Sequence, residues 1–393
     1  MRIAIVNQSR RKIGGAEVYL DSIITALALA GHEIASLCED DTEYAGREPI
    51  RLPVSAPAWC AATLGASQAI TQLAAWRPDI CFSHGLNSPE LEAHLVDRFP
   101  SVLYLHNFYG TCISGTKTHN TSTPACCERR FGAACLIQYF PKRCGGNNPF
   151  TMLQLYRQQS QRLDTMRRYR ALIANSDYVA RDLMKHGLSS HRVYYPLLAP
   201  LQVPASEPVI HDEIRLVFAA RMTSLKGGQY LLAALSDVQH RLQRRIQLTM
   251  AGDGPDRASW EQTANAIRSE SIRIDFPGWL GAADLGNTLA ASHLLVYPSI
   301  WPEPFGLSGL EAGVYGVPSV AFAVGGIPEW LHDGVNGHLA PVGVQPLSDA
   351  IVRCLSDSQH YQQLRAGASR RAQEYTLDAH LSELVPILER AAR

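Results

Sequence analysis

This 393-residue sequence lacks a membrane-spanning segment, an excess of basic residues and a secretory signal, and each absence excludes a class of protein. No run reaches the roughly 18 consecutive apolar residues of a membrane-spanning helix, so no spanning segment is expected. Lys+Arg and Asp+Glu both number 36, and without a basic excess a nucleic-acid partner is not expected. The basic residues Arg10, Arg11 and Lys12 follow the first apolar run, which is the wrong order for a secretory signal. We therefore expect a cytoplasmic protein.

What is present indicates two α/β domains. The composition, 46% hydrophobic and 18% charged, is typical of a folded globular chain, and the length allows two full cores. A Pro-rich, weakly patterned stretch at 196–208 reads as a linker between them. Short apolar runs alternate with helical patterns on both sides of it, which predicts parallel sheets covered on both faces. Strands are expected at 2–6, 33–37, 79–83, 102–105, 171–175, 192–195, 215–219, 247–250, 272–276, 293–299 and 319–322.

The stretch from Trp301 to Glu311, WPEPFGLSGLE, has the strongest functional pattern. It follows an apolar strand, and Gly306 and Gly309 leave backbone N–H groups open to a phosphate where a helix begins. Glu303 and Glu311 bracket this anion site. A ligand with phosphate in the middle and hydroxyl groups at both ends, such as a sugar nucleotide, suits the pattern.

A second anion-binding pattern begins where the strand at 215–219 ends. Arg221 and Lys226 lie five residues apart, before Gly227 and Gly228. A planar guanidinium and a mobile ammonium can share one diphosphate, so we expect them to stabilise the charge of a departing nucleoside diphosphate. Surface cations without a ligand are the simpler alternative.

Together these motifs resemble the retaining glycosyltransferases of family 4, which have the GT-B fold. Glu303 and Glu311 match the family's E-x₇-E signature, and further matches occur in the family's order over nearly the whole chain. Those matches are GGAE at 14–17, ARMTSLKGG at 220–228, GGIPE at 325–329 and DGVNG at 333–337.

The resemblance implies two Rossmann-like parallel-sheet domains facing each other across a cleft. It places an N-terminal acceptor-binding domain at 1–197, a linker at 198–212 and a domain for the donor nucleotide at 213–375. A final helix at 376–393 is expected to cross back to the N-terminal domain. We expect closure of the domains about the linker to exclude water.

The resemblance also implies roles for individual residues. Glu303, His106, Arg221 and Lys226 are the expected catalytic residues, with Glu303 bonding hydroxyls of the transferred sugar. The family often has Asp after the histidine, whereas this chain has Asn107. The residues expected to bind the donor are Gly14, Gly15, Gly252, Gly278, Phe305, Gly306, Leu307, Ser308 and Glu311.

The function implied is transfer of a sugar, with retained configuration, from a nucleotide sugar to a saccharide or lipid-linked acceptor. UDP- and GDP-sugars are the expected donors, and assembly of polysaccharide, glycolipid or glycoconjugate is the expected role. No cofactor is expected for catalysis, since the chain lacks the Asp-x-Asp triplet of metal-dependent glycosyltransferases. The alternatives are an epimerase or phosphorylase with a GT-B-like fold, and a catalytically silent scaffold that binds sugar nucleotides.

An insert that does not follow the family pattern is expected at about 107–150, and it holds five of the nine cysteines. In a cytoplasmic chain such a cluster indicates a metal site more often than disulfides, although free thiols in a packed loop remain the alternative. Resemblance to family members with a multi-cysteine loop selects a structural zinc site. Its expected ligands are Cys112, Cys127, Cys135 and Cys144.

The region 129–170 is rich in basic residues, with only Glu128 and Asp164 nearby in sequence as acids. A solvated helix face explains most such runs. The alternative hypothesis is a peripheral contact with an anionic acceptor or with the acidic inner face of a membrane. The basic residues are Arg129, Arg130, Lys142, Arg143, Arg157, Arg162, Arg167, Arg168 and Arg170.

Overall fold

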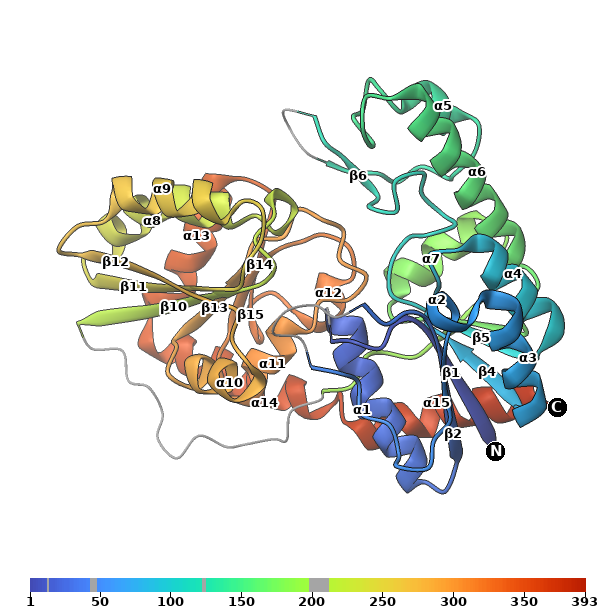
Figure 1. Cartoon of the computed structure of the whole chain (residues 1–393). Coiled ribbons are helices and arrows are strands. Elements are labelled where there is room, and N and C mark those ends of the chain that lie inside the picture. Colours follow the sequence, from blue (N-terminus) through green and yellow to red (C-terminus); the bar gives the residue numbers. More distant parts are fainter. Residues whose placement is uncertain (13, 43–47, 122–124, 198–211) are drawn as a thin grey trace. The chain divides into compact units, whose positions relative to one another are not determined.

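A computed structural model describes residues 1–12, 14–42, 48–121, 125–197 and 212–393. The chain divides into two units, the first formed by Met1–Leu198 with Leu377–Arg393 and the second by Ala199–Thr376 (Figure 1). All but the last residue of the linker expected at 198–212, and most of the Pro-rich stretch at 196–208, lie outside the described residues.

Unit 1 is a parallel sheet with helices on both faces. Its strands are β1 (Arg2–Ser9), β2 (Glu33–Asp40), β3 (Ala58–Cys60), β4 (Ile80–Ser83), β5 (Ser101–Leu105), β8 (Ala171–Ala174) and β9 (His191–Arg192). Its helices are α1 (Gly15–Leu29), α2 (Ala61–Leu64), α3 (Ala66–Trp76), α4 (Pro89–Arg98), α5 (Ala134–Gln138), α6 (Pro149–Met166), α7 (Asp177–Lys185) and α15 (Leu377–Ala392). The strand order is β3-β2-β1-β4-β5-β8-β9, and every neighbouring pair is parallel.

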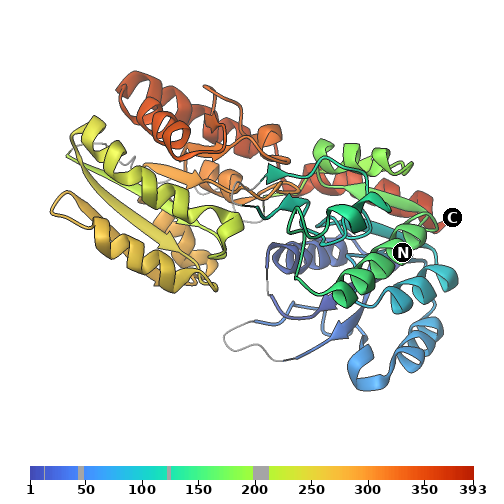
Figure 2. The ribbon, with the colours of Figure 1, turned by 90° about the horizontal axis from the view of Figure 1, so that it is seen from above.

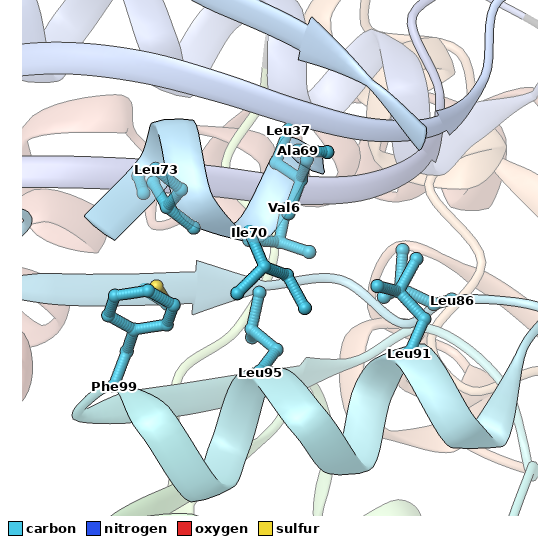
Figure 3. Packing of buried hydrophobic residues seen from close by; sticks show 11 residues of the cluster. Val6, Leu37, Ala69, Ile70, Leu73, Leu86, Leu91, Leu95 and Phe99 are labelled. Carbon is cyan, nitrogen blue, oxygen red and sulfur yellow. The ribbon is translucent and has the colours of Figure 1, made fainter. Parts of the chain in front are cut away.

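The sheet of unit 1 forms because its strands are apolar along nearly their whole length. The run from Ile3 to Val6 is almost completely buried, as are all residues of β4 and β5. Strands buried on both faces need such continuous apolar runs, and the crossover helices supply the cover. On one face, Val6 and Leu37 pack against Ile70 of α3 and Leu95 of α4 (Figure 3).

Helix α15 belongs to unit 1 although it is the last element of the chain. It packs against β4 and β5, and Figure 2 shows this red helix within the same unit as the N-terminal elements. Its Leu384 and Leu388 are fully buried. The hydroxyl of Tyr19 in α1 lies 2.9 Å from Nε2 of His380 in α15. The segment that follows the linker and unit 2 thus completes the core of unit 1.

The insert between β5 and α6 carries little regular structure. Its elements are α5 and a two-stranded antiparallel pair, β6 (Thr118–His119) and β7 (Ala125–Cys126). Figure 1 shows β6 and α5 away from the strands, beside the N-terminal end of α6.

Unit 2 repeats the architecture with six parallel strands. They are β10 (Glu213–Ala219), β11 (Arg245–Ala251), β12 (Ile272–Gly278), β13 (Leu294–Tyr297), β14 (Ser319–Phe322) and β15 (Gly337–Ala340). The other elements are a 3₁₀ turn η1 (Ser224–Lys226) and the helices α8 (Gly228–Leu242), α9 (Arg257–Ile267), α10 (Ala282–Ala290), α11 (Ser308–Val314), α12 (Ile327–Trp330), α13 (Val344–Leu355) and α14 (Ser358–Gln373). The strand order is β12-β11-β10-β13-β14-β15.

The order of unit 2 reverses between β10 and β13. Helices α8, α9 and α13 lie on one face of the sheet, and α10, α11 and α14 on the other (Figure 1). Ligands of such sheets bind beyond the carboxyl ends of the strands, at the point where the order reverses. The loops after β10 and β13 are therefore the ones that the topology selects. The predicted class of fold, two Rossmann-like parallel-sheet domains, is confirmed.

Candidate active site

Glu303 is the centre of a buried polar cluster in unit 2. It lies in the loop between β13 and α11, and only 3% of its surface is exposed. One oxygen, Oε1, accepts three hydrogen bonds, from Lys226 Nζ at 2.6 Å, Ser299 Oγ at 2.7 Å and Tyr297 Oη at 2.9 Å. Burial and the adjacent carboxylate raise the pKa of Tyr297 well above its usual value, so this phenol remains a donor. The carboxylate is held firmly before any donor binds.

Lys226 reaches Glu303 because its own loop presses against the end of β13. Its ammonium also lies 4.7 Å from the centre of the Trp301 ring, within cation–π range. Gly227 follows with φ of +74°, and a Cβ there would lie 1.8 Å from the carbonyl oxygen of Pro298. Only glycine fits this approach of the two loops. The Lys-Gly-Gly pattern is thus explained first by packing.

Arg221 lies at the neighbouring strand end, just after β10. Its side chain is exposed, and it forms no ion pair with any residue that the structure describes. The hydroxyl of Ser308 donates to the carbonyl of Ala219 at 3.4 Å, which ties the start of α11 to the same strand end. Arg221, Lys226, Glu303 and Ser308 therefore gather at the reversal point of one sheet.

The loop that opens α11 differs from the expected phosphate site in one respect. Helix α11 has only seven residues, so fewer aligned peptide dipoles face this loop than at the start of a long helix. Phe305 is buried, and its carbonyl accepts a 2.8 Å bond from the indole of Trp330. A Cβ at Gly309 would lie 2.0 Å from the same ring. Packing thus fixes this loop as well.

Of the remaining residues of unit 2 expected to bind the donor, Gly252 and Gly278 lie at other strand ends, whereas Gly306, Leu307 and Glu311 belong to the loop and helix after β13. Gly252 follows β11, and a Cβ there would lie 2.0 Å from the carbonyl oxygen of Ala220. Its amide donates to the carbonyl of Gly278 at the end of β12. Gly306 has φ of +91°, which favours glycine, and Leu307 precedes the first residue of α11. Burial raises the pKa of Glu311, in the first turn of α11.

In unit 1, Gly14 and Gly15 begin α1 as expected. The amide of Gly14 donates to Oε2 of Glu17 at 2.8 Å, which caps the helix. A Cβ at Gly15 would meet no atom within 4 Å, so space rather than packing surrounds this position. The open face leaves room for a ligand against the backbone.

His106 does not present a free ring nitrogen. Its Nε2 lies 2.8 Å from Nδ1 of His84, and its Nδ1 is hydrogen-bonded to the hydroxyl of Tyr195. Burial lowers its pKa to about 3, and burial together with His106 lowers the pKa of His84. Both imidazoles are neutral at pH 7. The role predicted for His106, contact with sugar or acceptor, stays a prediction.

The sequence motifs did not include Tyr297, Ser299 or Tyr195, which hydrogen-bond to Glu303 or His106. Tyr297 and Ser299 end the β13 run, and only their position after a buried strand could have indicated their role. Tyr195 and His84 share an edge of the unit 1 sheet with His106. The contact of His380 with Tyr19 joins residues 361 apart, and no local pattern predicts it.

Four cysteines of the insert are near one another. The pKa of Cys144 is raised to about 11, first by burial and then by the thiols of Cys112, Cys127 and Cys135. Within the described residues, however, no group of three or more His, Cys, Asp or Glu side chains is arranged to hold a metal ion. The structure thus gives the predicted zinc site no support, and zinc stays a prediction.

Several basic side chains at 129–170 pair with acidic side chains, so the net positive charge of this region is smaller than the sequence suggested. Arg162 pairs with Glu92 at 3.2 Å, Arg167 pairs with Asp164, and Arg168 pairs with Asp97. Glu128 and Asp164 are the acids of this stretch of sequence, but α4 lies alongside α6 and supplies two more carboxylates, those of Glu92 and Asp97. No helix in the described part of the chain is long and apolar enough to cross a membrane.

Comparisons with known proteins agree with this arrangement. Residues 13–195 match the family model described as Glycosyltransferase Family 4, and residues 213–357 match the one described as Glycosyl transferases group 1. A D-inositol 3-phosphate glycosyltransferase of Saccharomonospora viridis is 33% identical over 49% of this chain and 45% of its own. An alpha-maltose-1-phosphate synthase of Mycolicibacterium smegmatis is 27% identical over 56% of this chain and 58% of its own. The chain thus spans about half the length of the curated relatives it matches.

Solved structures match the fold over the full length. The Anabaena protein HepE in complex with UDP and glucose has a TM-score of 0.71 at 19% identity, covering 99% of this chain and 100% of its own. Sucrose-phosphate synthase of Thermosynechococcus elongatus has a TM-score of 0.73 at 18% identity, covering 99% and 98%. The two family models together account for both units. The chain belongs to the glycosyltransferases of family 4, group 1.

Proposed function

We propose that this protein transfers a sugar from a nucleoside diphosphate sugar to a hydroxyl group of a saccharide or lipid-linked acceptor, with retention of configuration. The observation that carries the proposal is the Lys226–Glu303 pair, buried at the reversal point of the unit 2 sheet. A buried ion pair is costly to desolvate, and the fold gains no obvious support from placing one at a strand end. Binding of the donor explains an ion pair at this strand end better than stabilisation of the fold does.

In this proposal the two charged groups separate when the donor binds. The diphosphate draws Lys226 toward Arg221, whose guanidinium has no ion-pair partner among the described residues. Glu303 is then freed to accept hydrogen bonds from hydroxyls of the transferred sugar. Tyr297 and Ser299 keep its carboxylate in place meanwhile. The two cations would stabilise the charge of the leaving group, and the proposed reaction needs no divalent ion.

The donor is proposed to be a UDP- or GDP-sugar. Support comes from the solved HepE complexes, which contain UDP, UDP with glucose, and UDP-glucose. The curated relative of Saccharomonospora viridis is a glycosyltransferase by its name. Assembly of polysaccharide, glycolipid or glycoconjugate is the proposed role.

The test is a thermal shift and donor-hydrolysis panel of UDP-, GDP- and ADP-sugars with EDTA present. The wild type is compared with Glu303→Gln, which keeps the shape of the side chain. Glu261→Gln is the matched control, since that glutamate forms an exposed pair with Arg257 in the same unit. We expect one donor class to stabilise the wild type. We expect the Glu303 variant to lose at least ~100-fold in turnover, as for loss of one charged transition-state contact, and the control to lose none.

Other outcomes distinguish the alternatives. Donor consumed without an acceptor and converted to an isomer indicates an epimerase, and dependence on inorganic phosphate indicates a phosphorylase. Donor binding without turnover in any form indicates a scaffold. If no sugar nucleotide binds, the assignment of the 303–311 loop is refuted.

We further propose that the insert, rather than the arginines at 162–168, meets acidic lipid. Ile137 and Phe150 are 73% and 79% exposed, and no acidic residue occurs from Arg129 to Leu163. Apolar side chains among cations favour an acidic bilayer surface. In co-sedimentation, vesicles with anionic lipid are expected to bind the wild type and to release the double variant Ile137→Asp, Phe150→Asp. Equal binding to neutral vesicles would contradict a contribution of the basic side chains to membrane binding.

A further inference from the structure

Trp301 helps to join the two loops that carry the Lys226–Glu303 pair. It is half-buried and lies in the loop after β13, whereas Lys226 is the last residue of the 3₁₀ turn η1. The carbonyl oxygen of Leu225 accepts hydrogen bonds from the amides of Ile300 and Trp301, at 2.9 and 3.1 Å. The two loops are therefore fastened to each other at the residue that precedes Lys226.

This attachment places the face of an indole beside the Lys226 ammonium. Nζ lies 4.7 Å from the centre of the Trp301 ring and 5.7 Å from the centre of the Tyr297 ring. Its polar contacts include Glu303 Oε1 at 2.6 Å and Tyr297 Oη at 3.3 Å. An ammonium carries three N–H donors, which match the carboxylate, the phenol and the indole face.

These partners respond differently to an arriving diphosphate. The side chain of Lys226 is 18% exposed, so an anion can reach the ammonium. Glu303 carries a negative charge and competes with that anion for the cation. The indole of Trp301 has no net charge, so it attracts the ammonium beside either anion. Because cation–π attraction extends to ~6 Å from the ring centre, the ammonium can move by roughly 1 Å without losing the ring.

We propose that Trp301 is a positioning residue for Lys226, whose ammonium its ring holds while the cation exchanges the Glu303 carboxylate for the diphosphate of the donor. This inference rests on the proposed glycosyl transfer, since the donor supplies the diphosphate. The affinity for a nucleoside diphosphate then depends on the electron density of one indole face, although that ring itself forms no hydrogen bond to the phosphate.

The test is calorimetric titration of the full chain with UDP and GDP, the nucleotides of the proposed donors. Trp301→Leu keeps an apolar side chain but removes the aromatic face. We expect it to raise the Kd for the nucleoside diphosphate about five-fold. Trp301→Phe keeps a weaker aromatic face, so its Kd should rise only about two-fold.

Trp76→Leu is the matched control. It removes a ring of unit 1 whose centre lies 4.9 Å from the Arg2 guanidinium, a pair of the same kind in a helix with no expected role in binding. The Kd of this variant should equal that of the wild type.

Fluorinated tryptophans, inserted at position 301 by nonsense suppression, separate electronic effects from shape. Fluorine withdraws electron density from the ring face and changes the volume of the side chain little. The logarithm of Kd should therefore rise steadily with the number of fluorine atoms. Should the leucine variant fail to fold, this series decides the question.

The cation is tested with Lys226→Met, in which Trp301→Leu should cause no further loss of affinity. An equal loss in both backgrounds would overturn the proposal, because the ring would then act without the cation. Unchanged or tighter binding by Trp301→Leu, or a Kd that is independent of fluorination, would also overturn it. If no nucleotide binds the wild type, the proposed function is refuted with it. If nucleotides bind and the ring makes no difference, only the role of Trp301 is refuted.

Discussion

Replacing Lys226 with Met leaves the Glu303 carboxylate buried without its cation. The side chains of the two residues are 18% and 4% exposed, so the pair is largely desolvated. Removing one partner of a fully buried pair costs ~3–5 kcal/mol. Since Tyr297 and Ser299 still donate to the carboxylate, we expect the lower end, ~3 kcal/mol. For a unit of this size that corresponds to a fall in Tm of about 6–12 °C.

Glu303→Gln should cost less, ~2 kcal/mol, because the amide oxygen can still accept from Tyr297 and Ser299. The double variant should cost ~3 kcal/mol rather than the ~5 kcal/mol of additive effects, a coupling energy of ~2 kcal/mol. Calorimetry of the unit 2 transition for all four proteins measures this. As the control cycle, Arg257→Met and Glu261→Gln break an exposed pair, whose coupling should stay below ~0.5 kcal/mol.

Additive costs, within ~0.5 kcal/mol, would refute the interpretation of Lys226 and Glu303 as a coupled buried pair. A coupling of the expected size with unchanged donor turnover would show that the pair is structural only. Loss of both coupling and turnover is what the proposed function requires.

Three further predictions concern other parts of the chain. Gly309→Ala should lower Tm by several degrees, because the new Cβ would collide with the Trp330 ring. Gly15→Ala, whose Cβ would meet no atom within 4 Å, should leave Tm unchanged but weaken donor binding if the donor lies against that backbone. Thermal shift with and without donor measures both effects. The free energy of unfolding should fall as the pH is lowered from 6.5 to 4, because the pKa of His106 is about 3 in the folded state and only the unfolded chain binds a proton there. In melts at several pH values, His106→Gln should lose ~1 kcal/mol less per pH unit than the wild type, and an unchanged profile would contradict this prediction. Purified protein should carry one zinc per chain if Cys112, Cys127, Cys135 and Cys144 bind metal. Metal analysis and activity after chelation test the zinc site, and a metal-free, fully stable protein would refute it.

The strands were predictable because parallel sheets covered on both faces need continuous apolar runs. The runs at 2–6, 102–105 and 215–219 each lie within an observed strand, with ends shifted by a few residues. Of the strand expected at 192–195, only Arg192 lies in an observed strand, β9 (His191–Arg192), which is at the edge of the sheet, where fewer neighbours fix its length.

The motifs placed Arg221, Lys226 and Glu303 just after two strands, and the structure puts the ends of those strands at the reversal point of the second sheet. The sequence could not show that Lys226 bonds to Glu303, because 77 residues separate them and the bond depends on how two loops meet. For the same reason it assigned Arg162 to a basic surface, whereas the neighbouring helix buries that residue against Glu92.

By itself, the sequence determined the class of fold, the family and the strand ends that carry the charged groups. These follow from local periodicity and from motif spacing, which each segment carries alone. Only the tertiary structure decided which side chains meet. It paired the two ring nitrogens of His106 with His84 and Tyr195, and it joined the final helix to the first unit, because hydrogen bonds between distant segments form only after the elements have packed.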